Sequence, residues 1–142
     1  MNEELSEFVK ELDEKKMIDL NSSIIKASKQ DILKHMGFIG KEIKTYQTLL
    51  KDYRFIDELD ELSLGHHIRW FNITRPDHLV LNKGAMLTKI EYKNNEILLL
   101  CKGYNRRYFQ LKMNDLILFQ KFTSQEIVLI SILDYIQENH SV

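Results

Sequence analysis

Cysteine, proline and glycine are scarce in this chain of 142 residues, which holds one cysteine (Cys101), one proline and five glycines. So few prolines and glycines, with 44% hydrophobic residues, exclude a linker, a low-complexity segment or a disordered protein. A single cysteine excludes an intrachain disulfide and any zinc site that needs two thiolates. This usage is typical of a reducing compartment, so we expect an intracellular, cytoplasmic protein.

Long apolar runs are missing as well. No stretch approaches the roughly 20 apolar residues that cross a bilayer, and residues 1–7 are acidic where a secretory signal would be basic. We therefore expect no membrane association and no targeting segment. Lysine outnumbers arginine by 15 to 5, and alanine is limited to two residues. This usage suggests an AT-rich genome such as that of a phage, a large DNA virus or a low-GC bacterium.

Charge is unevenly distributed, although the formal net charge is only −1. Residues 1–65 carry 10 Lys/Arg and 14 Asp/Glu, residues 66–121 carry 10 and 4, and residues 122–142 carry none and 3. A basic segment between acidic flanks allows two interpretations. Either the basic segment binds a polyanion such as nucleic acid, or acidic helices neutralise a basic sheet within the molecule.

The first half of the chain has helical periodicity. Apolar residues at steps of three and four predict an amphipathic helix over residues 5–20. Ser28 and Asp31 resemble a capping box that begins a second helix. This helix carries an apolar seam about 33 Å long at 1.5 Å per residue. The seam consists of Ile32, Met36, Ile39, Ile43, Tyr46, Leu50 and Tyr53. It predicts a protein interface, either with the first helix or with a second copy of the chain.

Two glycines fall inside that seam, and each costs about 1 kcal/mol relative to alanine in a continuous helix. Either Gly37 ends one helix and a new helix follows it, or Gly37 and Gly40 allow close helix packing.

The second half changes to a period of two, which predicts strands. The expected strands cover residues 66–74, 79–81, 85–92, 96–102, 106–112 and 116–121, with a two-residue turn at Asn94 and Asn95. Short turns favour pairing of strands that are consecutive in sequence. Thr123 and Glu126 form a capping box for a last helix that starts at Ser124. Because that helix is apolar around most of its circumference, we expect it to be buried on more than one side.

These elements predict an α+β fold. A helical arm or hairpin over residues 1–65 precedes a five- to six-stranded antiparallel meander, a small barrel or bent sheet, which is capped by the C-terminal helix over residues 66–142. The two regions are separate domains or form one compact domain. Over residues 66–140 this element order resembles the pleckstrin-homology type of barrel, or an SH3-like barrel with an added helix. The resemblance rests on element order, without a shared motif, and does not imply a function.

No catalytic or metal-binding signature is present, so we expect a non-enzymatic binding or scaffold protein. We expect it to act through contacts with a protein partner or a second copy, without cofactor, metal or small-molecule substrate. The alternative is a nucleic-acid-binding module that uses cations and rings on one sheet face. Its residues are Arg69, Phe71, Lys89, Arg106, Tyr108 and Lys112. A third interpretation, a small enzyme, would require His66, His67, His78 and Cys101 to converge.

Overall fold

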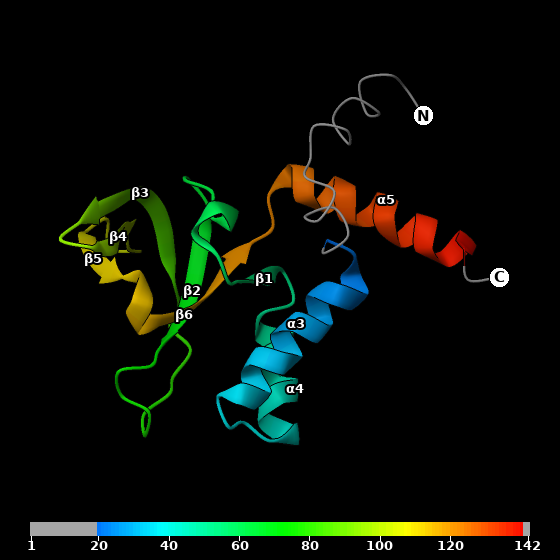
Figure 1. The fold of residues 1–142 in the computed structure, drawn as a ribbon, viewed down its shortest axis with the longest axis horizontal. Coiled ribbons are helices and arrows are strands. Elements are labelled where there is room, and N and C mark those ends of the chain that lie inside the picture. Colours follow the sequence, from blue (N-terminus) through cyan, green and yellow to red (C-terminus); the bar gives the residue numbers. More distant parts are fainter. Residues whose placement is uncertain (1–19, 141–142) are drawn as a thin grey trace. The chain divides into compact units, whose positions relative to one another are not determined.

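The computed structural model describes residues 20–140, and the chain divides into two compact units. One unit contains Met1–Gln47 and Phe122–Val142, and the other contains Thr48–Lys121. Figure 1 shows the elements of both units. Except for Leu20, the helix expected over residues 5–20 lies outside the described residues. Independent folding of residues 66–142 stays a prediction.

An asparagine starts the first described helix, α3 (Ser22–His35). The side-chain oxygen of Asn21 accepts a hydrogen bond from the backbone N–H of Ile24 at 2.9 Å. This bond satisfies one of the N–H groups that a helix start leaves without an intrahelical partner. The prediction that the helix begins at Ser28 is therefore wrong, because Asn21 forms the cap and Ser22 and Ser23 lie in the first turn.

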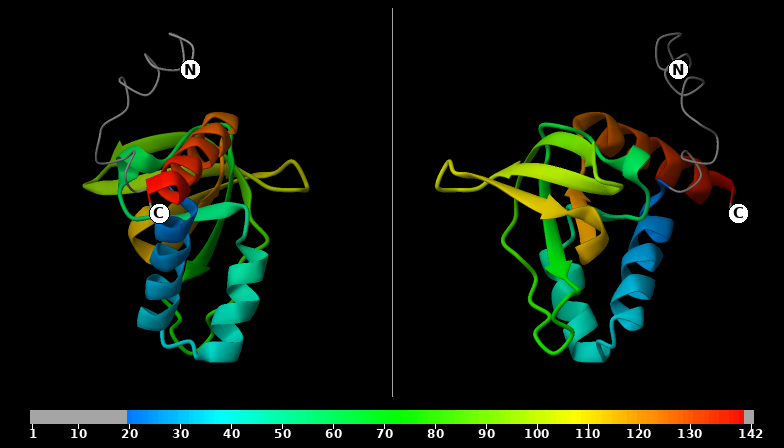
Figure 2. Two further views of the ribbon diagram at one scale, coloured as in Figure 1. Left: turned by 90° about the vertical axis from the view of Figure 1, so that its right-hand side faces the viewer. Right: turned by 60° about the vertical axis from the view of Figure 1, so that its left-hand side comes forward.

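Gly37 separates α3 from α4 (Gly40–Leu49). Its φ of +93° lies in the left-handed region, and its N–H donates to the Lys34 carbonyl oxygen at 2.9 Å. Glycine is favoured there because it has no Cβ. The helix break is thus confirmed, and the continuous seam is not formed. The rings of Phe38 and Tyr46 pack with centroids 4.7 Å apart, and α3 and α4 lie side by side (Figure 2).

The C-terminal helix α5 (Ser124–His140) begins at the predicted residue. The N–H of Glu126 donates to the Thr123 hydroxyl at 3.1 Å, and the N–H of Thr123 donates to the Glu126 carboxylate at 3.0 Å. These reciprocal bonds confirm the capping box.

Asp134 connects α5 with α3, since its carboxylate accepts hydrogen bonds from the Ser22 N–H at 2.8 Å and from the Ser22 hydroxyl at 2.5 Å. A carboxylate at a helix start also complements the helix dipole.

Six antiparallel strands form the sheet of the second unit, in the order β1-β6-β2-β3-β4-β5. They are β1 (Tyr53–Ile56), β2 (His67–Asn72), β3 (Ala85–Lys93), β4 (Glu96–Lys102), β5 (Tyr108–Lys112) and β6 (Leu116–Lys121). Asn94 and Asn95 both have positive φ, which confirms the predicted two-residue turn. The strands of the β3–β4 hairpin run at a steep angle to β2 and β6, to which the bend of the sheet connects them (Figure 2). With β1 and β5 at its two ends, the sheet is open and bent, not closed into a barrel.

The pairing differs from the sequence prediction in three respects. Tyr53 belongs to β1 and not to a helix, and residues 79–81 form no strand. In addition, β6 lies between β1 and β2, so β5 and β6 are consecutive in sequence without being neighbours. The physical reason is burial: the consecutive residues Leu118, Phe119 and Gln120 are all buried, so both faces of β6 are covered, as is typical of a strand in the middle of a sheet.

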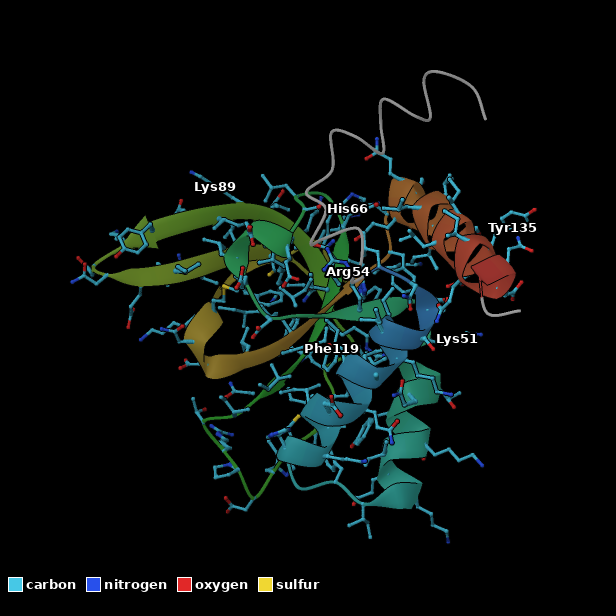
Figure 3. The ribbon with its side chains drawn as sticks, turned by 45° about the vertical axis from the view of Figure 1, so that its right-hand side comes forward. Lys51, Arg54, His66, Lys89, Phe119 and Tyr135 are labelled. Atoms are coloured by element: carbon cyan, nitrogen blue, oxygen red, sulfur yellow. The ribbon has the colours of Figure 1, made fainter. Side chains whose placement is uncertain are left out.

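The hydrophobic core lies on one face of the sheet. Its buried residues are Ile56, Ile68, Trp70, Ala85, Leu87, Leu99, Cys101, Leu116 and Leu118. On the opposite face Phe119, labelled in Figure 3, is fully buried. Its ring centroid lies 6.0 Å from that of Phe55 and 6.1 Å from that of Phe71. The central strands therefore bury apolar side chains on both faces.

Candidate functional site

The seven residues predicted as a protein interface do not share one helical stripe. Ile32, Met36, Ile43 and Tyr46 are partly buried in the α3–α4 region, Leu50 is fully buried beyond α4, and Tyr53 starts β1. Ile39 is 70% exposed and lies between α3 and α4. Their role in binding a protein stays a prediction, without the regular seam that suggested it.

Three of the six residues predicted to bind nucleic acid are either buried or lie beside a carboxylate. Phe71 is fully buried, so its ring cannot stack on a base. Lys89 forms an ion pair with Glu91 at 3.0 Å, and Lys112 forms one with Glu96 at 3.6 Å. The predicted sheet face therefore carries carboxylates next to two of its cations, which weakens its attraction for phosphate.

The other three predicted residues lie toward the opposite end of the strands. Arg69 donates to the backbone carbonyl oxygens of Asn82 at 2.9 Å and Leu49 at 3.4 Å. Arg106 is exposed in the turn before β5 with a φ of +62°, and Tyr108 is 59% exposed. This end of the sheet keeps the exposed cations and rings.

A row of six side chains crosses this end of the sheet on one face. Directly paired residues of antiparallel strands have their side chains on the same face. The register pairs Tyr53 with Lys121, His67 with Met86, Met86 with Lys102, and Lys102 with Tyr108. Continuing the β2–β6 register by one residue places His67 beside Lys121. We call Tyr53, Lys121, His67, Met86, Lys102 and Tyr108 the sheet-end row.

Two tyrosines hold the imidazole of His67 within this row. The Tyr53 hydroxyl lies 2.7 Å from Nδ1 of His67, and the Tyr104 hydroxyl lies 3.2 Å from Nε2. Burial, with the positive charges of Lys121 and Arg69, lowers the pKa of His67. The imidazole is therefore neutral near pH 7, and a neutral ring donates through one nitrogen and accepts through the other. Burial also raises the pKa of Tyr53, so its phenol stays protonated.

Gly84 allows the His67 ring to take this position. A Cβ at residue 84 would overlap the His67 ring and the backbone oxygen of Ile68, and the φ of Gly84 is +101°. Its N–H is held by the side-chain oxygen of Asn82 at 2.8 Å. The loop before β3 therefore supports the imidazole from a position where no other residue fits.

Stability should decrease as the pH falls below about 6.5, because His67 has a lowered pKa only when folded. As the pH falls, His67 is protonated in the unfolded chain at a higher pH than in the folded chain. The stability that neutral His67 contributes is therefore fully present above its unfolded pKa and is lost as the pH falls toward its folded pKa. Urea unfolding, followed by the fluorescence of the single tryptophan, Trp70, measures this between about pH 5.5 and 7.5. His67→Gln should flatten the pH dependence; equal slopes for variant and wild type would contradict the prediction.

The histidines and the cysteine considered for an enzyme do not converge. Among residues 20–140 no three His, Cys, Asp or Glu side chains are grouped so that they could hold a metal ion. Cys101 lies in the core on the face opposite to His67, and burial raises the pKa of its thiol to about 11. A thiol with this pKa is almost entirely protonated at neutral pH, and only the thiolate is nucleophilic.

Helix α5 presents a second surface of interest. Ile127, Val128, Tyr135 and Ile136 are 55%, 50%, 68% and 45% exposed. At 100° per residue these four fall on about half of the helix circumference, whereas the buried Leu129 lies on the other half. We call the four residues the α5 apolar face; Tyr135 is labelled in Figure 3. The prediction that α5 is buried on more than one side is wrong for these residues.

Neither surface contains a sequence motif that would have revealed it, because each depends on which residues become buried. No helix in the described part of the chain is both long and apolar enough to pass through a membrane. Comparisons of the chain with protein-family models, with curated proteins and with solved structures found no match.

Proposed function

We propose that the chain is a non-enzymatic binding protein that acts through protein–protein contacts, and that the α5 apolar face is its contact surface. The exposure of four large apolar side chains on one half of a single helix carries this proposal. Exposed apolar area that is concentrated on one face typically marks an interaction site.

Charge is absent from this half of the helix between Ile127 and Ile136. The remaining residues that share it over this span are Ser131, which is exposed, and Ile132, which is partly buried. A surface helix usually directs charged side chains to solvent. Here an apolar half faces solvent instead, so a partner would bury it without desolvating a charge.

The proposed occupant is an amphipathic segment of another protein with lysine or arginine beside its apolar face. Residues 122–142 contain Glu126, Asp134 and Glu138 but no lysine or arginine. Two copies of α5 packed face to face would bring these acids together, which opposes self-association. A basic segment would gain favourable electrostatics in addition to apolar burial.

The test is binding of a fluorescent amphipathic peptide of leucine and lysine at helical spacing, followed by anisotropy. The full-length chain should bind it, and the double variant Ile127→Ser and Ile136→Ser should weaken binding by at least about tenfold, since each buried isoleucine contributes about 1.5–3 kcal/mol. A peptide in which glutamate replaces lysine should bind far more weakly.

Val80→Ser is the matched control, because Val80 is 59% exposed, lies outside α5 and is not among the residues that the sequence predicts as a protein interface. It should leave the affinity unchanged. Equal losses for Val80→Ser and the α5 variant would contradict the proposed surface. Light scattering adds a second measurement: a dimer that the α5 variant converts to a monomer would identify a second copy as the occupant and overturn the proposed partner.

A further inference from the structure

We propose that the sheet-end row, together with Tyr104, Arg106 and Arg107, binds single-stranded nucleic acid. This is a second binding activity, on the sheet of the unit Thr48–Lys121, and it does not depend on the α5 apolar face. Three observations carry it: the local excess of cations, the exposed rings beside them, and the way these rings are held.

The charge at this end of the sheet is strongly positive. The contributing segments are residues 50–53, 66–69, 82–86, 101–108 and 120–121, and they contain seven lysines and arginines against one acid, Asp52. Lys102, Lys121, Arg106 and Arg107 form no ion pair with a described residue. Cations without partners retain their full attraction for phosphate, so this end is the favourable one for a polyanion.

The opposite end of the same sheet provides an internal comparison. There the cations of Lys89 and Lys112 lie 3.0 Å and 3.6 Å from the carboxylates of Glu91 and Glu96. A phosphate would have to compete with a carboxylate for each of these lysines. Both ends of the sheet carry lysines. They differ in whether a carboxylate lies beside the lysine, and the position of each lysine on its strand decides this.

Aromatic rings lie among the cations of the sheet end. Tyr104 is 76% exposed and Tyr108 is 59% exposed, and the ammonium group of Lys102 lies 5.7 Å from the centroid of the Tyr108 ring. Bases that are not paired stack on such rings while nearby cations contact the phosphates. Met86, 46% exposed in the same row, adds apolar surface between the cations.

The structure also fixes the orientation of one ring in advance. The Tyr104 hydroxyl contacts Nε2 of His67 at 3.2 Å, and the two rings pack with centroids 5.9 Å apart. A ring already held in position loses little conformational entropy on binding. From β6 to β5 the sheet-end row extends roughly 19 Å across the strands, at about 4.8 Å per strand. This length suits a short stretch of single-stranded nucleic acid.

Single strands fit these features better than duplex DNA or an acidic peptide. In a duplex the bases are stacked on each other, so exposed tyrosines would gain nothing from them. An acidic peptide would use the lysines and arginines but has no flat bases for the rings. Loss of affinity on removing the rings therefore distinguishes a single strand from both.

The test is fluorescence anisotropy with a labelled oligodeoxythymidine of about 12 nucleotides and the full-length chain, from about 50 to 300 mM salt. Affinity should fall steeply with salt. The double variant Lys102→Gln and Lys121→Gln should weaken binding about tenfold. It should also reduce the slope of log affinity against log salt by roughly 1.4, because each phosphate contact on a single strand contributes about 0.7. Tyr104→Ala and Tyr108→Ala should each weaken binding at least about fivefold.

Matched controls come from the other end of the sheet. Lys89→Gln with Lys112→Gln, and Tyr92→Ala, remove the same residue types at exposed positions and should leave the affinity unchanged. The proposal fails if no binding occurs at the lowest salt concentration, or if the control variants weaken binding as much as the row variants. It also fails if a duplex of equal length binds as tightly, or if polyglutamate competes equally and the tyrosine variants have no effect.

Discussion

Replacing Gly84 with alanine should lower the free energy of unfolding of the sheet by about 3 kcal/mol or more. Two penalties combine at this position. The φ of +101° is strained for any residue with a Cβ, and that Cβ would overlap the Ile68 carbonyl oxygen and the His67 ring. Urea unfolding monitored by Trp70 fluorescence measures the loss, because Trp70 is buried in the sheet core.

Gly65→Ala separates the two penalties. Gly65 has a φ of +80°, but nothing lies within 4 Å of the position that its Cβ would take. It should therefore show the backbone strain alone, about 1–2 kcal/mol. If Gly65→Ala and Gly84→Ala destabilise equally, the close packing of residue 84 against His67 has no energetic consequence, and the support that we assign to this loop is wrong.

Leu99→Ala should destabilise the sheet by about 3–4 kcal/mol, whereas Leu98→Ala and Leu100→Ala should each cost less than half as much. All three residues belong to one apolar run in β4, but only Leu99 is fully buried in the core cluster. Deleting its side chain removes buried methyl groups and leaves a cavity that the neighbouring strands cannot fill. The same unfolding measurement applies; equal losses at the three positions would contradict the observed register of β4.

The elements that could be predicted from the sequence have local causes. The capping box of Thr123 and Glu126 sets the start of α5, and the Asn94–Asn95 turn fixes how β3 meets β4. In both cases the residues that determine the geometry lie within four positions of each other, so no long-range contact is needed.

The helix start at Asn21 shows how a local signal can be misjudged. Asn, Ser and Asp are all good N-cap residues, and the chain offers Asn21 and Ser28 within one short stretch. Both mark a plausible start on propensity alone. The structure places α3 from Ser22, since the periodic burial of Ile25, Lys29 and Leu33 begins before Ser28.

The candidate surfaces were the least predictable features. The row depends on pairing between strands that are far apart in sequence, such as β1 with β6, and no local rule sets that register. A register shift between Leu87 and Lys89 interrupts the simple alternation of β3. The sequence predicted a basic sheet with aromatic residues, and Arg106 and Tyr108 belong both to the predicted set and to the surface that we propose. Lys89 and Lys112 of the predicted set lie beside glutamates, which the sequence did not indicate.

Composition and short-range patterns determined on their own that helices precede and follow an antiparallel sheet along the described part of the chain. Hydrophobic periodicity and turn residues suffice for this because they act over a few positions. The tertiary structure alone decided that β6 lies inside the sheet, which leucine of β4 enters the core and that the apolar half of α5 faces solvent. It also decided which lysines lie beside a carboxylate among residues 20–140. These outcomes depend on which segments pack against each other. Burial of apolar side chains depends on all segments together, so short-range patterns do not determine it.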